Sequence, residues 1–479
     1  MKYDDWDFPW KKEVGSRKMT IPATTFDVKD FGAVGDGAAN DTAAIQNALD
    51  SAEAAGGGVV TFPPGVYLSG SVFIGNNTEL NLPKGATIWG IQEIEQYRRI
   101  RTRVAGIETT WPAALLNVIG KENVIISGTG TIDGRGKIFW DDFWEKVNSY
   151  YEPNGLRWAA DYDCQRPRGI LVQESRNVEV KDAVIYRAGF WSVHILYSQY
   201  VTVRGLCIFN NIEGHGPSTD GIDIDSSEYI LVEQCRIDCN DDIICLKAGR
   251  DADGLRVNRK TQFVLIRDCH SGIGGGLIVF GSETSGGISH VMAERCKACG
   301  TAAAVAFKGA VIRGGGVHSC YFRDIELEKT WHVVHFNFTW LPEYCYPRLP
   351  EKFHSKEIPQ LWKTLLAPVD PARGIPKFFG LHFRNLRGKR VQGDMLLVRG
   401  HQEITIQEVT IQDCCFSGKC AGHLEGIENW KLENVSFEQV EKPLTFGERI
   451  SSLSMKHVTC NGLALSLDST MQLKDGKGD

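Results

Sequence analysis

Residues 200–208 read YVTVRGLCI and residues 229–237 read YILVEQCRI, so that apolar and polar residues largely alternate in each stretch. Alternation over such a short run is typical of a β-strand. The phrase returns along the chain with a polar turn after it, and its other copies begin at residues 123, 177, 262, 289, 404 and 430. From residue 177 to residue 289, successive copies start 23 to 33 residues apart. A strand repeat of this period predicts a solenoid, in which each coil buries its apolar face against its neighbours.

Two other architectures fit this pattern less well. A βαβ fold needs helical patterns between its strands, and the phrases are not separated by such patterns. A β-sandwich would place hairpin signals such as Asn-Gly between the runs, and these are scarce. We therefore expect an all-β chain that forms one right-handed parallel β-helix, similar to the pectate-lyase solenoid.

A short helix is expected to cap the N-terminal end of this solenoid. Residues 41–58 (DTAAIQNALDSAEAAGGG) carry apolar residues at helical spacing, with Asp41 as a candidate N-cap and Gly56 as a stop. The first coil is then expected to begin at residues 59–70 (VVTFPPGVYLSG). A soluble solenoid needs its exposed end covered, which is the role we assign to this helix.

We expect an N-terminal extension over residues 1–25 and a single catalytic domain over residues 26–479. Two stretches near residues 137–168 and 333–373 break the repeat and are rich in Trp, Tyr and Phe. Insertions between solenoid coils usually become loops on one face, where aromatic rings can stack on sugars. The alternative is that these rings pack together as small satellite cores.

Composition excludes several classes of partner. The chain is 42% hydrophobic and 23% charged, with a formal net charge of −6. Nucleic acid and membrane surfaces bind basic protein surfaces, so we expect neither as the main partner. No apolar run approaches the ~20 residues that span a bilayer. The start, MKYDDWDFPWKK, has no apolar segment and predicts no signal peptide; the protein is then expected to be cytoplasmic, or periplasmic or secreted if a signal peptide has been removed.

The 14 cysteines do not read as a disulfide framework. Cys235, Cys269 and Cys296 occupy the same point of the repeated strand phrase. One structural position repeated in this way indicates small buried thiols stacked along the core. Disulfides remain an open alternative for the three later cysteines, Cys414, Cys415 and Cys420.

Three carboxylates carry the main functional signal. Asp220 precedes Asp241 by 21 residues and Asp242 by 22, which is about one coil. Neighbouring coils lie roughly 4.8 Å apart, so the three should meet on the same outer wall. Crowded carboxylates raise one another's pKa, and a proton held near neutral pH supplies the general acid that glycoside hydrolysis requires. The alternative is a calcium site or polar turn residues, to which Asp223 and Asp225 could also belong.

Several motifs occur in one order along the chain. They are FDVKDFGAVGDGAANDTAAIQNAL (26–49) with VVTFPPGVYLSG (59–70), GFWSVH (189–194), STDGIDIDSS (218–227), NDDIICLKAG (240–249) and GSETSGG (281–287). This series resembles glycoside hydrolase family 28, the polygalacturonase family, over about residues 26–316. The resemblance implies a pectic polysaccharide or oligosaccharide as substrate, inversion at the anomeric carbon, and neither metal nor cofactor.

The resemblance also implies roles for individual residues. Asp241 matches the general acid that protonates the leaving oxygen, and Asp220 and Asp242 match the pair that holds the attacking water. Further substrate-binding residues are expected at matching positions and close to the acidic motif: Trp191, His194, His215, Lys247, Glu283 and Lys308.

Three positions depart from the family pattern. The family's Gly-His-Gly falls on residues 274–276, so Gly275 stands in place of the histidine. Its Arg-Ile-Lys falls on residues 306–308, where Ala306 replaces the arginine and Lys308 remains. Ser218 replaces the asparagine of Asn-Thr-Asp. His215, just upstream, is either a turn residue or a replacement ligand that reaches the same pocket.

These departures bear on the leaving sugar. In typical members the missing histidine and arginine serve a leaving galacturonate, whose carboxylate an arginine grips better than any other side chain. Their loss favours a neutral leaving sugar such as rhamnose, and residues 155–168 and 213–227 also look similar to bacterial members that act on rhamnogalacturonan. We therefore predict an exo-acting glycosidase that removes galacturonate α-1,2-linked to rhamnose, with the long insertions closing one end of the cleft.

Three other functions stay open at this point. An exo-polygalacturonase acting on homogalacturonan is favoured slightly by Lys308. A non-catalytic carbohydrate-binding β-helix would be natural had the aspartates been lost. A pectate lyase would use calcium and a basic Arg or Lys rather than an acid cluster. The oligomeric state has no signature in this sequence.

Overall fold

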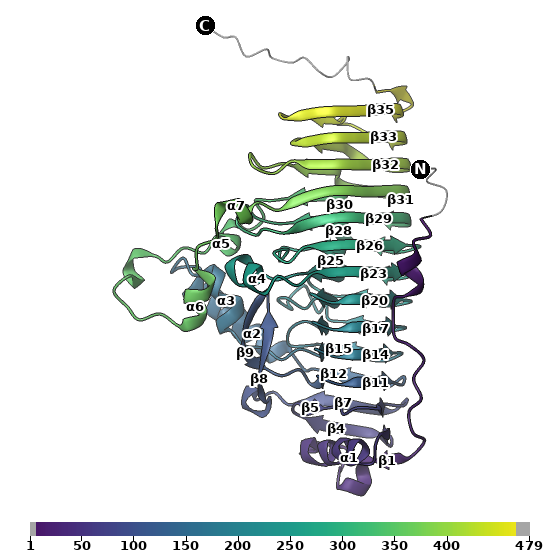
Figure 1. The fold of residues 1–479 in the computed structure, drawn as a ribbon, viewed down its shortest axis with the longest axis vertical. Helices are drawn as coiled ribbons and strands as arrows, with labels where there is room; N and C mark the ends of the chain where they lie inside the picture. Colours follow the sequence, from purple (N-terminus) through teal and green to yellow (C-terminus); the bar gives the residue numbers. More distant parts are fainter. Residues whose placement is uncertain (1–5, 466–479) are drawn as a thin grey trace.

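The computed structural model describes residues 6–465, which form a long stack of β-coils (Figure 1). Thirty-four strands join in one sheet, and each strand pairs in parallel with the equivalent strand of the next coil, except at the terminal β35–β36 hairpin. The predicted all-β, right-handed parallel β-helix is confirmed. No described helix is both long and apolar enough to span a bilayer.

The strands fall into three columns that run along the stack. The first column contains β1 (Thr25–Asp27), β3 (Gly58–Thr61), β6 (Thr78–Asn81), β11 (Glu122–Ser127), β14 (Arg176–Lys181), β17 (Gln199–Arg204), β20 (Glu228–Glu233), β23 (Thr261–Arg267), β26 (Ile288–Glu294), β29 (Gly316–Glu328), β31 (Lys377–Arg399), β32 (Ile406–Leu424), β33 (Ile427–Glu438) and β35 (Ile450–Cys460). Each phrase identified in the sequence contains a strand of this column, and those that begin at residues 123, 177, 200 and 229 continue through a turn into a strand of the second column.

The second and third columns complete each coil. The second contains β2 (Asp36–Asn40), β4 (Gly65–Ser69), β7 (Ala86–Gly90), β12 (Thr131–Asp133), β15 (Val184–Tyr186), β18 (Cys207–Phe209), β21 (Arg236–Asp238), β24 (His270–Ser271) and β27 (Lys297–Cys299). The third contains β5 (Val72–Phe73), β10 (Leu116–Ile119), β13 (Ile170–Gln173), β16 (Val193–Leu196), β19 (Ile222–Asp225), β22 (Ile244–Lys247), β25 (Gly274–Phe280), β28 (Thr301–Lys308), β30 (His332–Asn337) and β34 (Thr445–Phe446). The third column carries the functional site.

The core is a set of stacked apolar side chains inside the coils. Val178, Val201, Ile230 and Val264 occupy one level of four successive coils in register, and all four are fully buried. Burying each such side chain stabilises the fold by about 1.5–3 kcal/mol relative to exposure. The alternation of the strand phrase follows from this arrangement, because every second side chain points into the stack.

The first residue of each of the four phrases that begin at residues 123, 177, 200 and 229 has a left-handed backbone. Asn123 and Asn177 have φ of 59° and 58°, a conformation that asparagine tolerates better than most residues. Their amides also form a ladder, since Asn177 Nδ2 donates to Asn123 Oδ1 over 2.6 Å. Tyr200 and Tyr229 take over this position in later coils and stack with ring centroids 4.9 Å apart. Contacts between equivalent residues of neighbouring coils thus stabilise a left-handed backbone conformation that is locally unfavourable.

The cysteines lie as the repeat predicts. Cys235, Cys269 and Cys296 are buried at equivalent positions of β-coils, two residues beyond paired strand ends. All 14 cysteines fall within residues 6–465 and all are free. The open disulfide alternative for Cys415 and Cys420 is therefore wrong, as it is for the buried Cys414.

The capping helix is α1 (Thr42–Ala54), which buries its apolar face on the N-terminal end of the stack. Asp41 stands at its N-cap, but its carboxylate accepts hydrogen bonds from the Val34 and Gly35 amides rather than from the helix. Gly56 follows the helix with φ of 88°, the left-handed conformation expected of a stop signal. The first coil begins before this helix and not after it, because β1 already pairs with β3.

Residues 6–24 run along the outside of the stack (Figure 1). The Gly15 amide donates to the Tyr229 carbonyl, and the Ser16 amide donates to Thr202 Oγ1. Because the strands from β1 to β36, apart from the β8–β9 hairpin, belong to one sheet, we propose that residues 26–479 form a single domain with residues 1–25 as an extension.

The two insertions form a helical body on one side of the stack (Figure 1). The first contains α2 (Lys137–Lys146), the π-helical turn η4 (Val147–Tyr151) and α3 (Arg157–Asp163). The second contains α5 (Pro342–Cys345), η5 (Glu351–Phe353), α6 (Gln360–Leu365) and α7 (Pro371–Gly374). A hairpin of β8 (Arg99–Val104) and β9 (Ile107–Pro112), which the sequence did not reveal, packs with both.

Most aromatic rings of the insertions are buried in this helical body. The Trp158 and Trp362 rings pack edge-on with centroids 5.2 Å apart, and both side chains are buried. The Trp158 indole also donates to the Arg348 carbonyl across 190 residues of chain. The interpretation of the insertions as exposed sugar-stacking platforms is thus wrong for these rings, which form a satellite core instead.

Candidate active site

The three aspartates meet at the start of two neighbouring strands of the third column. Asp220 lies just before β19, and Asp241 and Asp242 lie just before β22. The Gly221 amide donates to the Asp242 carbonyl over 2.9 Å, so Asp220 and Asp242 are one coil apart in register. One oxygen of Asp220 lies within 4.8 Å of one oxygen of Asp242. The spacing of about one coil in the sequence therefore corresponds to side-by-side carboxylates.

These carboxylates line a cavity of about 220 Å³. They are thus enclosed, rather than exposed on the outer wall of the solenoid as the sequence led us to expect. Asp220 is only 3% exposed and Asp242 only 4% exposed, and residues of both insertions line the cavity with them. Seven of the predicted residues line the cavity together: Trp191, Asp220, Asp241, Asp242, Lys247, Glu283 and Lys308.

Burial and mutual repulsion keep a proton in this cluster. Burial raises the pKa of Asp241 to about 6, and the neighbouring charge of Asp242 adds to the effect. Burial also raises the pKa of Asp220 well above its usual value, with Asp223 and Asp241 contributing. A carboxyl group that remains protonated near neutral pH can act as a general acid.

Two lysines balance the negative charge of the cavity. Lys308 Nζ donates to Asp242 Oδ2 over 2.7 Å, and this ion pair is almost fully enclosed. Lys247 Nζ lies 3.7 Å from Asp220 Oδ2 and 3.5 Å from Asp223 Oδ1. Each lysine thus faces carboxylates of the protein itself, which lets the crowded acidic groups remain in one buried site.

Glu283 extends this network to the far wall of the cavity. Its carboxylate lies 3.4 Å from Lys247 Nζ and accepts a long hydrogen bond from the Tyr344 hydroxyl. Burial alone would raise the pKa of Glu283, but the charges of Lys247, Arg313 and Arg250 lower it. Glu283 is therefore an ionised group that holds Lys247 in place in the cavity wall.

His194 does not contact this cavity, which corrects the expectation from its motif. The side chain is fully buried and accepts a hydrogen bond at Nδ1 from Arg168 Nη1 over 2.8 Å. Burial lowers the pKa of His194 to about 4, so the ring is neutral at pH 7. The ring packs edge-on against Trp191 with centroids 4.7 Å apart. His194 thus supports the cavity-lining Trp191 rather than the substrate.

His215 does not reach the cavity as a replacement for the missing family histidine. It is a turn residue, which was the other interpretation of its position. Its Nε2 lies 2.8 Å from Asp141 Oδ1 on α2, and both side chains are exposed. The His215 carbonyl accepts a hydrogen bond from the Trp144 indole, also on α2. These contacts fasten the loop before Asp220 to the first insertion, outside the cavity lining.

The alternative of a metal site finds little support in the donor atoms. Asp225 is paired with Arg103 over 2.8 Å, and Asp223 faces Lys247. The Cys245 thiol lies within 4.8 Å of the Asp220 and Asp242 oxygens, but burial raises its pKa well above the usual value. A neutral thiol is a poor metal ligand, and calcium prefers six to eight oxygens. The cluster is better suited to proton transfer than to metal binding.

Of the three departures from the family pattern, Gly275 adjoins the carboxylates directly, and Ala306 adjoins Cys245, which contacts Asp242. A Cβ atom added at Gly275 would lie 2.7 Å from Asp242 Oδ1, so a side chain there would point straight at the acidic pair. Ala306 packs in a small apolar group with Cys245, Val279 and Ala303. Neither position supplies a cation or a hydrogen-bond donor to the cavity through its side chain.

Arg157 is one of the cavity residues that sequence reasoning missed. It lies at the start of α3, and its Nη1 donates to Asp161 Oδ2 over 2.6 Å, one helical turn along. Both side chains line the carboxylate cavity, as do the rings of Trp340 and Tyr344 from the second insertion. The sequence shows that Arg157 and Asp161 are four residues apart, which is typical of an ion pair on a helix. It does not show that this pair lies in the same cavity as the three aspartates.

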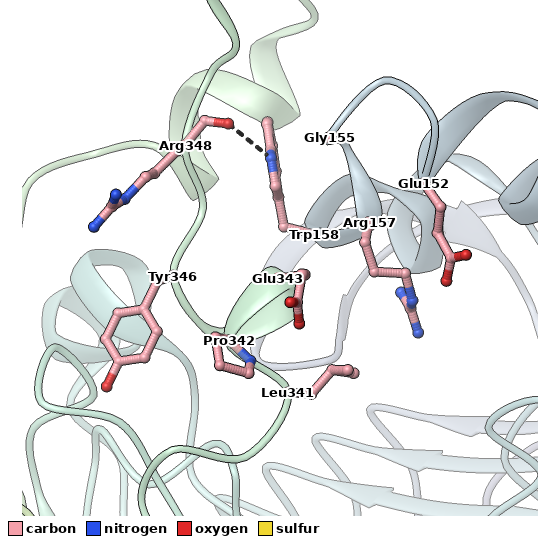
Figure 2. Close-up of a pocket in the computed structure, with 9 residues that line it drawn as sticks. All are labelled: Glu152, Gly155, Arg157, Trp158, Leu341, Pro342, Glu343, Tyr346 and Arg348. Atoms are coloured by element: carbon pink, nitrogen blue, oxygen red, sulfur yellow. Dashed lines mark hydrogen bonds between the residues drawn. The ribbon is translucent and has the colours of Figure 1, made fainter.

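A second cavity of about 650 Å³ adjoins the first and shares Arg157 and Leu341 with it. Figure 2 shows Glu152 and Arg157 on one side of this space and the segment that carries Glu343 and Arg348 on the other. Residues of both insertions therefore line this second cavity, which lies next to the cavity of the carboxylates.

A protein-family model matches the part of the chain that carries these residues. The model described as "Glycosyl hydrolases family 28" matches residues 100–341, which is half of the chain and spans all three aspartates. The chain belongs to this family.

Curated proteins with polygalacturonase names are among its relatives. A "Probable polygalacturonase" of Vitis vinifera is 30% identical over 314 residues, which cover 62% of this chain and 60% of the relative. An "Exo-poly-alpha-D-galacturonosidase" of Dickeya chrysanthemi is 26% identical over 354 residues, which cover 65% of this chain and 57% of the relative. The chain thus spans about three-fifths of the length of these curated relatives.

One solved structure has the same fold as this chain over most of the length of both. It is a hyperthermoactive exopolygalacturonase from Thermotoga maritima, with a TM-score of 0.74 and 26% sequence identity. The match covers 89% of this chain and 95% of that chain. The resemblance to the polygalacturonase family that the motifs indicated is therefore confirmed.

Proposed function

We propose that this family 28 protein is a glycosidase that removes terminal galacturonic acid from a pectic chain with inversion at the anomeric carbon. The observation that carries the proposal is the buried cluster of Asp220, Asp241 and Asp242, in which the pKa of Asp241 is raised to about 6. The printed names of the relatives, which include exo-acting polygalacturonases, support the same class of substrate.

The proposed reaction uses the carboxyl groups in two roles. Asp241 gives its proton to the glycosidic oxygen as the bond to the anomeric carbon breaks. A water molecule held by Asp220 and Asp242 attacks the opposite face of the sugar and passes its proton to one of these carboxylates. Lys308, bound to Asp242, holds that carboxylate in place during the transfer. The products are galacturonic acid of inverted configuration and a shortened chain.

The size of the cavity favours attack at a chain end. Its volume of about 220 Å³ is below the ~300–1,000 Å³ typical of pockets for drug-sized ligands. Residues of both insertions also line this cavity beside the carboxylates. Both features suit a single terminal sugar better than the middle of a long polymer.

We further propose that the leaving sugar is rhamnose, so that the substrate is rhamnogalacturonan. Neither Gly275 nor Ala306 offers the cationic or hydrogen-bonding group that a leaving galacturonate would need. An unpaired carboxylate buried at that position would be costly, whereas rhamnose has no carboxylate. The second candidate is an exo-polygalacturonase acting on homogalacturonan, which Lys308 and the names of the relatives favour.

Two oligosaccharides that differ only in the sugar next to the terminal galacturonate separate these candidates. We expect kcat/KM for release of galacturonic acid to be at least tenfold higher when that sugar is rhamnose, about 1.4 kcal/mol of discrimination. Equal or faster cleavage when it is galacturonate would instead support the exo-polygalacturonase. An unsaturated product would indicate a lyase, and binding without any release would indicate a carbohydrate-binding protein.

A further inference from the structure

We propose that Arg157, which comes from the insertion over residues 137–168, binds the carboxylate of the terminal galacturonate and makes the enzyme selective for an acidic end sugar. This inference rests on the proposed function and adds the group that recognises the substrate. The starting point is a problem of charge. The cavity that must accept an anionic sugar already has five carboxylate side chains in its walls: Asp161, Asp220, Asp241, Asp242 and Glu283.

The two lysines of the cavity are not spare cations. Lys308 is ion-paired with Asp242 over 2.7 Å. Lys247 lies between Asp220, Asp223 and Glu283, at 3.4 to 3.7 Å from each. A substrate carboxylate would have to compete with these internal partners, so a different cation is needed to attract it.

The corner of the cavity around Asp161 has a surplus of positive charge. Asp161 accepts hydrogen bonds from Arg157 Nη1 over 2.6 Å and from Arg166 Nη2 over 3.0 Å. Two guanidinium groups on one carboxylate leave a net charge of +1 among these three groups. Burial would raise the pKa of Asp161, but the two guanidinium groups hold it below its usual value. Arg166 is fully enclosed and also donates to the Pro217 carbonyl. Arg157 is therefore the guanidinium whose positive charge can attract a ligand carboxylate.

Arg157 has hydrogen-bond donors to offer a ligand. Within residues 6–465 its guanidinium makes one hydrogen bond, to Asp161, whereas a guanidinium carries five N–H donors. Its side chain is 17% exposed, and it lines both the carboxylate cavity and the adjoining larger one (Figure 2). A planar guanidinium with free donors at a cavity wall is the group best suited to grip a carboxylate.

The surroundings hold this guanidinium in position before a ligand arrives. Its centre lies 5.8 Å from the Phe143 ring and 5.7 Å from the Tyr344 ring, so each of the two insertions provides one aromatic neighbour. Asp161 also accepts a hydrogen bond from the Ser218 hydroxyl over 3.2 Å, two residues before Asp220. Binding then requires little loss of side-chain freedom.

The same contacts indicate which sugar Arg157 recognises. Through Asp161 and Ser218 it is tied to the coil of Asp220, the coil before Asp241 and Asp242. Lys308 lies at the end of β28, two coils after β22. Arg157 and Lys308 thus belong to opposite sides of the acid. A carboxylate bound by Arg157 is that of the terminal sugar, and the leaving sugar lies toward Lys308.

The test compares a terminal galacturonate with its primary amide, which has the same shape and no charge, on one leaving group. We expect Arg157→Gln to lower kcat/KM at least about thirtyfold for the acid, the scale of lost charge-assisted hydrogen bonds, and less than about threefold for the amide. Arg157→Lys keeps the charge and should lose part of the preference. The matched control is Lys146→Gln, which removes an i,i+4 ion pair with Asp142 on the exposed face of α2 and should leave both rates unchanged.

The outcomes separate this inference from the proposed function. Wild-type enzyme that releases no galacturonic acid would overturn the proposed function and the inference with it. A folded Arg157→Gln variant that loses equal activity on acid and amide would show a merely structural role and overturn only the inference. If that variant does not fold, Arg157→Lys decides the matter: unchanged preference for the acid would also overturn the inference.

Discussion

Replacing Asp241 by asparagine should inactivate the enzyme and, at neutral pH, stabilise its fold. The pKa of Asp241 is raised from 3.8 to about 6 in the folded protein, a difference of about two units. Each unit corresponds to about 1.4 kcal/mol, so ionising this group in the folded state opposes folding by about 3 kcal/mol. We regard that figure as an upper limit, because Asp241 keeps part of its surface toward the cavity.

The pH at which this effect appears follows from the direction of the shift. A carboxyl group whose folded pKa is raised gives its full stability below the unfolded value, near 3.8, and loses it as the pH rises through about 6. Asparagine stays neutral at every pH and keeps the hydrogen bond that the Asp242 amide donates to Oδ1. Asp241→Asn should therefore melt a few degrees above wild type at pH 7.5 and at about the same temperature at pH 4.

The matched variant is Asp242→Asn, for which stability should change in the opposite direction. It leaves the buried Lys308 without its ion-pair partner, which is destabilising. Both variants should lower turnover at least about a hundredfold, the usual scale of lost acid–base catalysis. Thermal melts at the two pH values at constant ionic strength, with turnover measured alongside, test this reasoning. An Asp241→Asn variant with no gain at pH 7.5, or wild-type rates in either folded variant, would refute it.

Two further predictions concern the reaction itself. The kcat/KM of the wild type should fall about tenfold per pH unit above about pH 6, because only protonated Asp241 can act as the acid; a rate that stays flat up to pH 8 would contradict this role. The first galacturonic acid released from an α-linked chain should be the β anomer by proton NMR, and in a substrate complex the Asp241 carboxyl should stand roughly 6.5–9.5 Å from the carboxylate that activates water. Release of the α anomer would indicate retention.

Much of the site could be predicted because it depends on the repeat. A separation of 22 residues between Asp220 and Asp242 is one coil, and the coil fixes which residues are neighbours. Lys308 was placed by its match to the family's Arg-Ile-Lys motif, and it lies on β28 of the same column of strands. His194 and His215 were assigned wrongly. Contacts with side chains that the repeat does not place hold both of them outside the cavity.

His194 shows the physical reason. Its motif places it beside Trp191, but Arg168 bonds to its ring, and the β8–β9 hairpin extends over this face, with the Arg103 carbonyl accepting a hydrogen bond from Arg168. His215 is held by Asp141 from an insertion helix 74 residues earlier. A motif in one sequence identifies a segment of the site, but not which side chains another segment will cover.

The sequence by itself determined the β-helix, its stacked core and the meeting of the three aspartates. Each of these depends on a strand pattern that repeats every 23 to 33 residues and pairs with its own copy one coil away. Only the tertiary structure decided the depth of the cavity and the position of Arg157. The insertions carry no repeat, and contacts such as that between Trp158 and Arg348 join residues 190 positions apart. Their packing depends on side chains from several distant segments at once, which no local pattern specifies.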